Sequence, residues 1–208
     1  MGIAERKQRE KLEMRQRILN GARKVFLQNG YEQASVRNIA SEISYSTGVI
    51  YLYFKDKREI FQELHKEGFS LLLKQLHVLD SVVDPFERLK SFGRVFIHFA
   101  QKNKDYYNLM FLVEESPRNS EESSFQIARS AISHLHNLIK ECQDKGWFKD
   151  METDYFSFMF LSAIHGICAL FCKNRTVAFA NRTNEELMEN GYACLVNLLD
   201  KDLFLYQY

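Results

Sequence analysis

Apolar residues recur along most of this chain at intervals of three and four positions. In an α-helix that spacing puts apolar side chains on one face, so the pattern predicts helices. Pro85 and Pro117 are the only prolines, and both fall between helical windows. The pattern therefore predicts an all-α fold of about nine helices, without internal repeats or low-complexity segments.

Capping residues, glycines and prolines set the expected ends of these helices. The pair Asn29–Gly30 should stop the first helix, and the pair Asp84–Pro85 should start a fifth. Thr183 and Glu186 have the spacing of a capping box. The expected helices run from the N-terminus to about residue 28, over 36–43, 48–53 and 57–79, from 85 onward, over 104–113, from a polar loop at 114–124 to about 145, from 154 onward, and from 184 to about 199.

The stretch 35–61 predicts a short helix, a tight turn, a second short helix and the capped start of a third. Ser35 can cap the first of these helices, and Ile50 and Phe54 should face the core from the second. A six-residue helix is roughly 9 Å long and fits a DNA major groove roughly 12 Å wide. Small residues at its start would let the backbone approach DNA, and tyrosine hydroxyls would reach phosphates and base edges.

The third of these helices begins with its own phosphate-binding features. Asp56 and Glu59 have the spacing of a capping box, and Lys55 and Lys57 lie beside the positive end of the helix dipole. Backbone amides and lysines at a helix start can clamp a phosphate. This stretch therefore predicts a helix-turn-helix that contacts DNA.

The segment from about Arg17 to Phe61 resembles the DNA-binding domain of the TetR family of bacterial transcriptional regulators. One departure is Ser44, which stands in the turn where the family usually has glycine. If this position needs a positive φ, serine costs of order 1 kcal/mol relative to glycine. The matching residues are Ile18-Leu19, Ala22, Phe26, Gly30-Tyr31, Ser35-Val36, Ile39-Ala40, Ser46, Gly48, Ile50-Tyr51, Tyr53-Phe54, Lys55 and Lys57.

The resemblance implies a sequence-specific regulator, most often a repressor that leaves a pseudo-palindromic operator when a small effector binds. It divides the chain into a helix-turn-helix DNA-binding domain, 1–58, and a helical effector-binding and dimerisation domain, 59–208. The expected DNA contacts are Ser35, Arg37, Ser46, Thr47, Gly48, Val49, Tyr51, Tyr53, Lys55 and Lys57.

The second domain is expected to form a homodimer through its last two long helices and to enclose a small, apolar or aromatic effector. Phenylalanine-rich faces are more often plain core, so each pocket residue competes with that simpler role. The pocket candidates are Phe92, Phe96, Phe99, Tyr106, Tyr107, Met110, Phe111, His134 and His165. The interface candidates are Phe156, Phe160, Ala163, Leu170, Leu187, Leu195 and Leu199.

Charge is unevenly divided along a chain whose net charge is only +1. Residues 1–58 hold 12 Lys and Arg against 6 Asp and Glu, a balance of +6, and the remaining residues hold 16 against 21, a balance of −5. A basic head on a mildly acidic body is the asymmetry expected when only the head meets DNA.

The remaining features favour a cytoplasmic protein without cofactor or metal. No signal peptide and no uninterrupted apolar run of membrane-spanning length is expected, since Ser157, Ser162 and His165 interrupt the most apolar stretch. His165, Cys168 and Cys172 share a helical face and could bind a soft metal or sense oxidation, but buried cysteines usually pack as small apolar groups.

Three alternatives to an effector-controlled repressor remain open. One is a related DNA binder that answers to a protein partner, and another is a nonspecific DNA-binding protein. The third is an all-helical enzyme, although the chain contains no Gly-rich phosphate loop, no HExxH and no GxSxG. The sequence does not identify the operator, the regulated genes or the effector, and it does not decide between a repressor and an activator.

Overall fold

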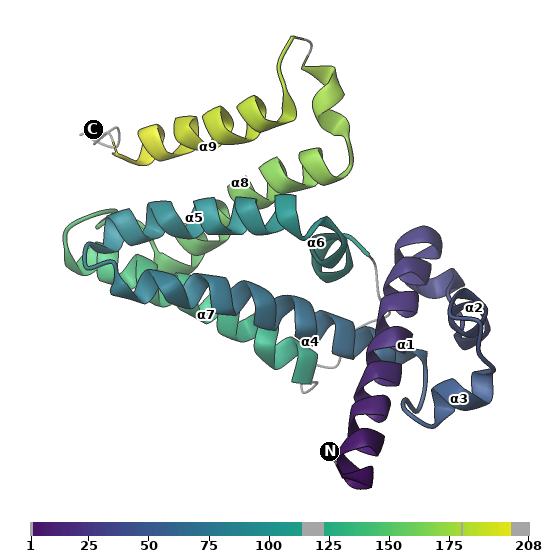
Figure 1. Ribbon diagram of the computed structural model, residues 1–208. Coiled ribbons are helices and arrows are strands. Elements are labelled where there is room, and N and C mark those ends of the chain that lie inside the picture. Colours follow the sequence, from purple (N-terminus) through teal and green to yellow (C-terminus); the bar gives the residue numbers. More distant parts are fainter. Residues whose placement is uncertain (1, 114–122, 180, 201–208) are drawn as a thin grey trace. The chain divides into compact units, whose positions relative to one another are not determined.

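The computed structural model describes residues 2–113, 123–179 and 181–200, and over these the chain is built from helices (Figure 1). The expectation of an all-α fold is confirmed for these ranges, in which no strand occurs. The helices are α1 (Ile3–Gln33), α2 (Val36–Glu42), α3 (Thr47–Tyr51), α4 (Lys57–Leu76), α5 (Pro85–Lys102), α6 (Lys104–Phe111), α7 (Ser123–Asp144), α8 (Thr153–Cys172) and α9 (Asn184–Asp200), with short 3-10 helices η1 (His77–Ser81) and η2 (Arg175–Ala178).

The chain divides into two compact units, each with its own core. The first unit holds residues 1–70 and 105–128, and the second holds 71–104 and 129–208. The division therefore falls inside α4, near residue 70, and not at residue 58 as the sequence suggested. The first turns of α4 stay with the N-terminal helices because Ile60, Phe61 and Leu64 are buried in the same core as α1.

Aromatic side chains from α1 and α4 form the centre of the first unit. Phe26, Tyr31 and Phe61 pack mutually, with ring centroids 4.8–5.8 Å apart. Gly30 has φ 73° and ψ 171°, so α1 kinks there and Tyr31 turns into the core. The predicted stop at Asn29–Gly30 thus corresponds to a kink, after which the helix continues to Gln33.

Tight contact between α1 and the end of α2 depends on a glycine. A Cβ added to Gly21 would lie 2.3 Å from Cγ2 of Ile43, so only glycine permits this approach. Lys24 of α1 and Glu42 of α2 form an ion pair at 3.0 Å beside it. These contacts fix α2, and with it the following turn, against α1.

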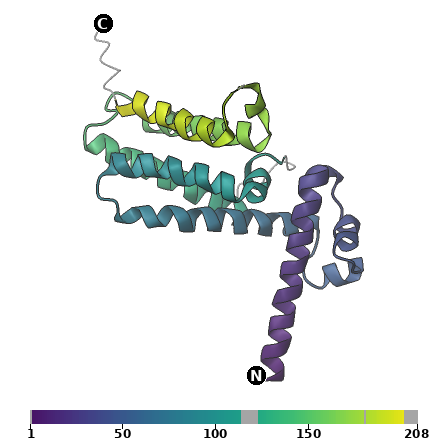
Figure 2. The same ribbon diagram turned by 45° about the horizontal axis from the view of Figure 1, so that its top comes forward.

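Helix α5 supplies much of the core of the second unit. Phe92, Phe96 and Phe99 are all buried, and the helix packs against α8 and α9 (Figure 2). The Tyr192 hydroxyl of α9 donates to the Lys90 carbonyl at 2.8 Å. Its ring lies where a Cβ on Gly93 would be, so this residue must be a glycine for α9 to pack so closely.

Capping residues end the helices largely as the sequence predicts. The Asp84 carboxylate accepts from the Glu87 amide at 2.8 Å at the start of α5. At the start of α9, Thr183 and Glu186 bond reciprocally, side chain to amide, at 3.1 and 2.9 Å. Three predicted helices are too long, because α3 ends at Tyr51, α6 ends at Phe111, and α4 ends at Leu76 and passes into η1. The predicted polar loop 114–124 lies mostly outside the residues described.

Helix α8 is the most apolar helix described. An 18-residue window within its 20 residues has a mean hydropathy of 1.8, so the helix is long and apolar enough to cross a membrane by length and composition alone. Ser157, Ser162 and His165 were expected to rule out a segment of membrane-spanning length. By length and composition that expectation is wrong. Only 33% of the apolar window is buried within the structure, so α8 presents apolar surface on one side to the core and on the other to the outside.

Candidate nucleic-acid interface

The turn between α2 and α3 is closed by backbone hydrogen bonds and by one residue in the left-handed region. The Ser35 hydroxyl accepts from the Asn38 amide at 3.2 Å and caps α2, as the sequence predicts. The amides of Ser44 and Tyr45 then donate to the carbonyls of Ser41 and Ala40 at 3.1 and 3.0 Å. Ser44 has φ 57°, so the serine occupies the strained position that the sequence analysis suspected.

Two buried side chains anchor helix α3 and the residues after it to the core, and another side of the helix is exposed. Ile50 and Phe54 are buried at 0% and 2% exposure, and the Arg15 guanidinium lies 4.9 Å above the Phe54 ring. Tyr51 is 57% exposed on the opposite side. Of the other candidates on this helix, Ser46 and Gly48 are exposed, and Thr47, Val49 and Tyr53 are half-buried.

A contact missed by the sequence analysis braces this helix from α1. The Arg17 guanidinium donates to the Tyr45 hydroxyl at 2.8 Å and lies 5.7 Å from the centre of its ring. Both side chains are exposed, and Tyr45 directly precedes the α3 cap. Sequence spacing could not pair two residues 28 positions apart. The position of Tyr45 in the turn of the helix-turn-helix was the feature that could have drawn attention to it.

The two lysines of the predicted phosphate clamp differ in the structure. Lys55 is exposed, and its amide donates to the Glu59 carboxylate at 2.5 Å. Lys57 is half-buried, and its ammonium donates to the carbonyls of Tyr31 and Glu32 at 2.8 and 3.4 Å. Its charge is thus used at the end of α1, where unpaired helix carbonyls favour a cation. A phosphate contact by Lys57 would have to compete with these bonds, whereas Arg37 and Lys55 remain exposed.

The predicted effector-pocket residues are divided between the two units. Tyr106, Tyr107, Met110 and Phe111 belong to the first unit, and the other five belong to the second. Within the second unit the aromatic residues pair as core: Phe92 stacks with His134 at 6.3 Å, and Phe96 meets His165 edge to face at 4.8 Å. The simpler core role therefore accounts for these side chains.

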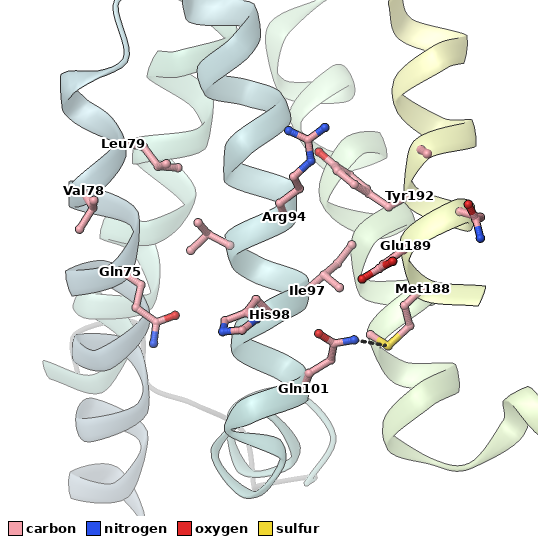
Figure 3. A pocket seen from close by; sticks show the side chains of 13 residues that line it. Gln75, Val78, Leu79, Arg94, Ile97, His98, Gln101, Met188, Glu189 and Tyr192 are labelled. Carbon is pink, nitrogen blue, oxygen red and sulfur yellow. Dashed lines mark hydrogen bonds between the residues drawn. The ribbon is translucent and has the colours of Figure 1, made fainter. Parts of the chain in front are cut away.

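The second unit instead has an open groove of about 880 Å³ between the end of α4, α5 and α9 (Figure 3). None of the nine predicted pocket residues lines it. Figure 3 shows Arg94 and His98 on α5, with Glu189 and Tyr192 on α9. The Gln101 amide donates to the Met188 sulfur at 3.4 Å on the same side. The lining residues are Gln75, Val78, Leu79, Arg94, Val95, Ile97, His98, Gln101, Met188, Glu189, Asn190, Tyr192 and Ala193.

Burial accounts for the His165, Cys168 and Cys172 set. Desolvation lowers the pKa of His165 to about 4 and raises the pKa of the Cys168 and Cys172 thiols to about 12 and 11. At neutral pH the imidazole is therefore uncharged and both thiols are protonated, so neither cysteine has the reactive thiolate form. These side chains behave as packing groups.

The predicted interface residues differ in how far they are buried within their own chain. Phe156, Phe160 and Leu199 are buried within their own unit at 2%, 1% and 7% exposure. Ala163, Leu187 and Leu195 are half-buried, and only Leu170 is exposed. Because α8 is apolar on both sides, periodicity alone could not tell its inner face from its outer one. The exposed apolar residues of the two helices are Tyr155, Phe158, Met159, Leu170 and Leu198.

Residues 18–64 match the family described as bacterial regulatory proteins, tetR family. The match spans α1 to the first turns of α4, which is the helix-turn-helix just described. Residues 18–64 carry a TetR-family DNA-binding domain.

Some relatives match this chain over a short segment, and others match over most of its length. A transcriptional repressor, AcnR of Corynebacterium diphtheriae, is 43% identical over 53 residues, 26% of this chain and 28% of that protein. A probable acrEF/envCD operon repressor of Escherichia coli is 25% identical over 173 residues, 79% of each chain. This chain thus spans under a third of the length of AcnR, the first of these curated relatives.

The fold of most of the chain is shared with solved structures. A FadR regulator from Bacillus subtilis, solved in complex with stearoyl-CoA, superposes with a TM-score of 0.71 at 17% identity, over 87% of this chain and 97% of that one. At this identity the likeness shows the fold alone.

We expect Ser44→Gly to stabilise the protein, because glycine adopts φ 57° without the clash that a Cβ suffers there. The free energy of unfolding should rise by about 0.5–1 kcal/mol in urea denaturation monitored by circular dichroism. Ser41→Gly is the matched control, since Ser41 is an exposed helical residue of α2 and should lose stability. Equal losses in both variants would show that the turn imposes no strain on Ser44.

Proposed function

We propose that this protein is a sequence-specific DNA-binding transcriptional regulator, acting as a repressor on a pseudo-palindromic operator. The observation that carries the proposal is α3, anchored by buried Ile50 and Phe54 while Tyr51 is exposed, within the segment that matches the TetR family. The relatives named above are themselves repressors, which argues against the enzyme alternative. A DNA operator as target would put its site of action in the cytoplasm of a bacterium.

The exposed face of α3 has the composition that a major-groove reader needs. A Cβ on Gly48 would meet only the Ser46 hydroxyl, at 3.6 Å, so packing within the chain does not require glycine there. The missing side chain instead leaves room for a groove wall to approach. Tyr51 would read base edges or phosphates next to it, and Arg37 and Lys55 would hold the flanking phosphates. Lys57 would act indirectly, by fixing the start of α4 to α1.

Tyr51→Ala should weaken operator binding at least tenfold without lowering the free energy of unfolding, since the side chain is largely exposed. Operator fragments would first be selected from random DNA at near-physiological salt and then titrated by fluorescence anisotropy. Tyr51→Phe separates the hydroxyl from the ring: an intermediate loss would assign part of the affinity to the hydroxyl. Val83→Ala, an exposed apolar residue of the second unit, is the control. Normal operator binding by Tyr51→Ala would remove this residue from the reading surface.

The outer face of α8, together with α9, supports a homodimer. Tyr155, Phe158 and Met159 are 77%, 73% and 42% exposed, and Leu198 of α9 is 58% exposed. Gly166 and Gly191 have nothing within 4 Å of an added Cβ in their own chain. Glycine inside a helix costs about 1 kcal/mol relative to alanine, so close packing of a second copy would explain both residues. A two-fold pairing of these helices would bury the apolar surface and set the spacing of two reading helices.

Gly166→Leu should therefore convert the dimer into a monomer, measured by analytical ultracentrifugation at micromolar concentration. Ser133→Leu, at an exposed helical position on α7, is the control for adding a leucine to the surface. If the glycine faced only solvent, Gly166→Ala would raise stability by about 1 kcal/mol and leave the mass unchanged. That pair of results would contradict this interface.

The groove of the second unit supports an effector with an apolar body and an anionic group. Leu79, Ile97 and Met188 contribute apolar surface, and the other lining residues include Arg94, which supplies a positive charge, and Glu189. The B. subtilis FadR holds stearoyl-CoA, so acyl-CoA esters and free fatty acids form a suitable first ligand set. Binding would release the operator only if the ligand prefers the conformation that fits DNA poorly. Control by a protein partner remains the alternative.

A ligand of this set should raise the melting temperature of the wild type and lower its operator affinity. Ala193→Trp should abolish both effects by filling the groove, which Ala193 lines. Asn197→Trp, one turn further along α9 and outside the lining, is the matched control. Unchanged ligand binding by Ala193→Trp, or no binding by the wild type, would exclude the groove and favour the partner-controlled alternative.

A further inference from the structure

His77, Asp80 and His134 bring three potential metal ligands together in the second unit. His77 and Asp80 belong to η1, and His134 lies on α7. Nδ1 of His77 lies 3.1 Å from one Asp80 oxygen, and Nε2 of His134 lies 3.9 Å from the other. The three ligand atoms all lie within 4.8 Å of one another. No other group of three such residues in the described ranges reaches this proximity.

The spacing fits a small ion. Tetrahedral zinc with bonds of about 2.0–2.1 Å keeps its ligand atoms roughly 3.3 Å apart, so modest side-chain rotation would complete the triangle. The two imidazole rings already meet edge to face, with centroids 5.7 Å apart. His77 and Asp80 are exposed, which leaves the outer side open for a water ligand.

The surroundings of the cluster suit a divalent cation. The Phe92 ring stacks on the imidazole of His134 with an interplanar angle of 19°, which fixes its orientation. The nearby Arg88 guanidinium donates to the Glu141 carboxylate at 2.5 Å, so its positive charge is balanced. Asp80 then remains as the anionic ligand between two imidazoles.

We propose that His77, Asp80 and His134 form a binding site for a divalent transition metal of the zinc class, with water as the fourth ligand. Two imidazoles and one carboxylate favour zinc, cobalt or nickel over magnesium and calcium, which prefer oxygen ligands. The ion would cross-link η1, which directly follows α4, to α7. Sequence spacing could not reveal the site, because His134 is far along the chain from the other two residues.

The test uses the full-length protein, stripped with a chelator and kept reduced, on a Cys194→Ser background that removes the exposed thiol. Zinc binding is measured by isothermal titration calorimetry, and Co²⁺ binding by its visible d–d spectrum. The variants are His77→Ala and His134→Ala. His136→Ala is the matched control. His136 lies on α7 like His134, and its imidazole also pairs with a carboxylate, that of Asp154 at 2.9 Å.

One zinc ion per chain should bind, raise the melting temperature and give the intense cobalt spectrum of a four-coordinate site. His77→Ala and His134→Ala should each lower the affinity at least tenfold, and His136→Ala should leave it unchanged. Because the His77 side chain is 63% exposed, its removal should not unfold the protein. Absence of stoichiometric binding, equal affinity in all three variants, or a loss confined to His136→Ala would each overturn the proposal.

Discussion

The joint between α1 and α4 is the constraint on which the first unit depends. Phe26, Tyr31 and Phe61 pack together only because Gly30 turns the end of α1 into the core, and Lys57 then donates to the carbonyls beyond the kink. This joint fixes the end of α1 and the start of α4, and α2 and α3 lie between these two points in the chain. Helix α3 has five residues and only one fully buried apolar side chain, so it could not hold its position alone. The position of its exposed face is therefore set by the contacts between α1 and α4.

Helix α6 extends this joint to a segment that follows α5 in the chain. Asp105 lies 3.9 Å from Arg23 of α1, and the Tyr106 hydroxyl donates to the Glu67 carboxylate of α4 at 2.9 Å. Burial and the Glu67 charge raise the pKa of Tyr106, so the phenol stays protonated as the donor. The chain crosses between the units inside α4, at the start of α6 and inside α7. Two of these crossings, in α4 and α6, lead into helices that contact α1.

The local features of this structure could be predicted from the sequence, but the contacts between residues far apart in the chain could not. Caps at Ser35, Asp84 and Thr183, and the strained turn at Ser44, depend on residues within four positions and follow from the sequence. The use of Lys57 by carbonyls near residue 31, and the bracing of Tyr45 by Arg17, depend on residues more than twenty positions away. The outward face of α8 could not be predicted for another reason. When both sides of a helix are apolar, amphipathic spacing carries no information about which side is buried.

The groove and the histidine cluster share one short element. Val78 and Leu79 line the groove, while the flanking His77 and Asp80 belong to the cluster, so four consecutive residues of η1 serve two different surfaces. The 3-10 helix η1 has five residues, and hydrogen-bond geometry in such helices is poorer than in an α-helix. Any ion that orders His77 and Asp80 also restricts Val78 and Leu79, and thereby changes the free energy of filling the groove. Linkage makes this coupling reciprocal, so a groove ligand would alter the metal affinity by the same factor.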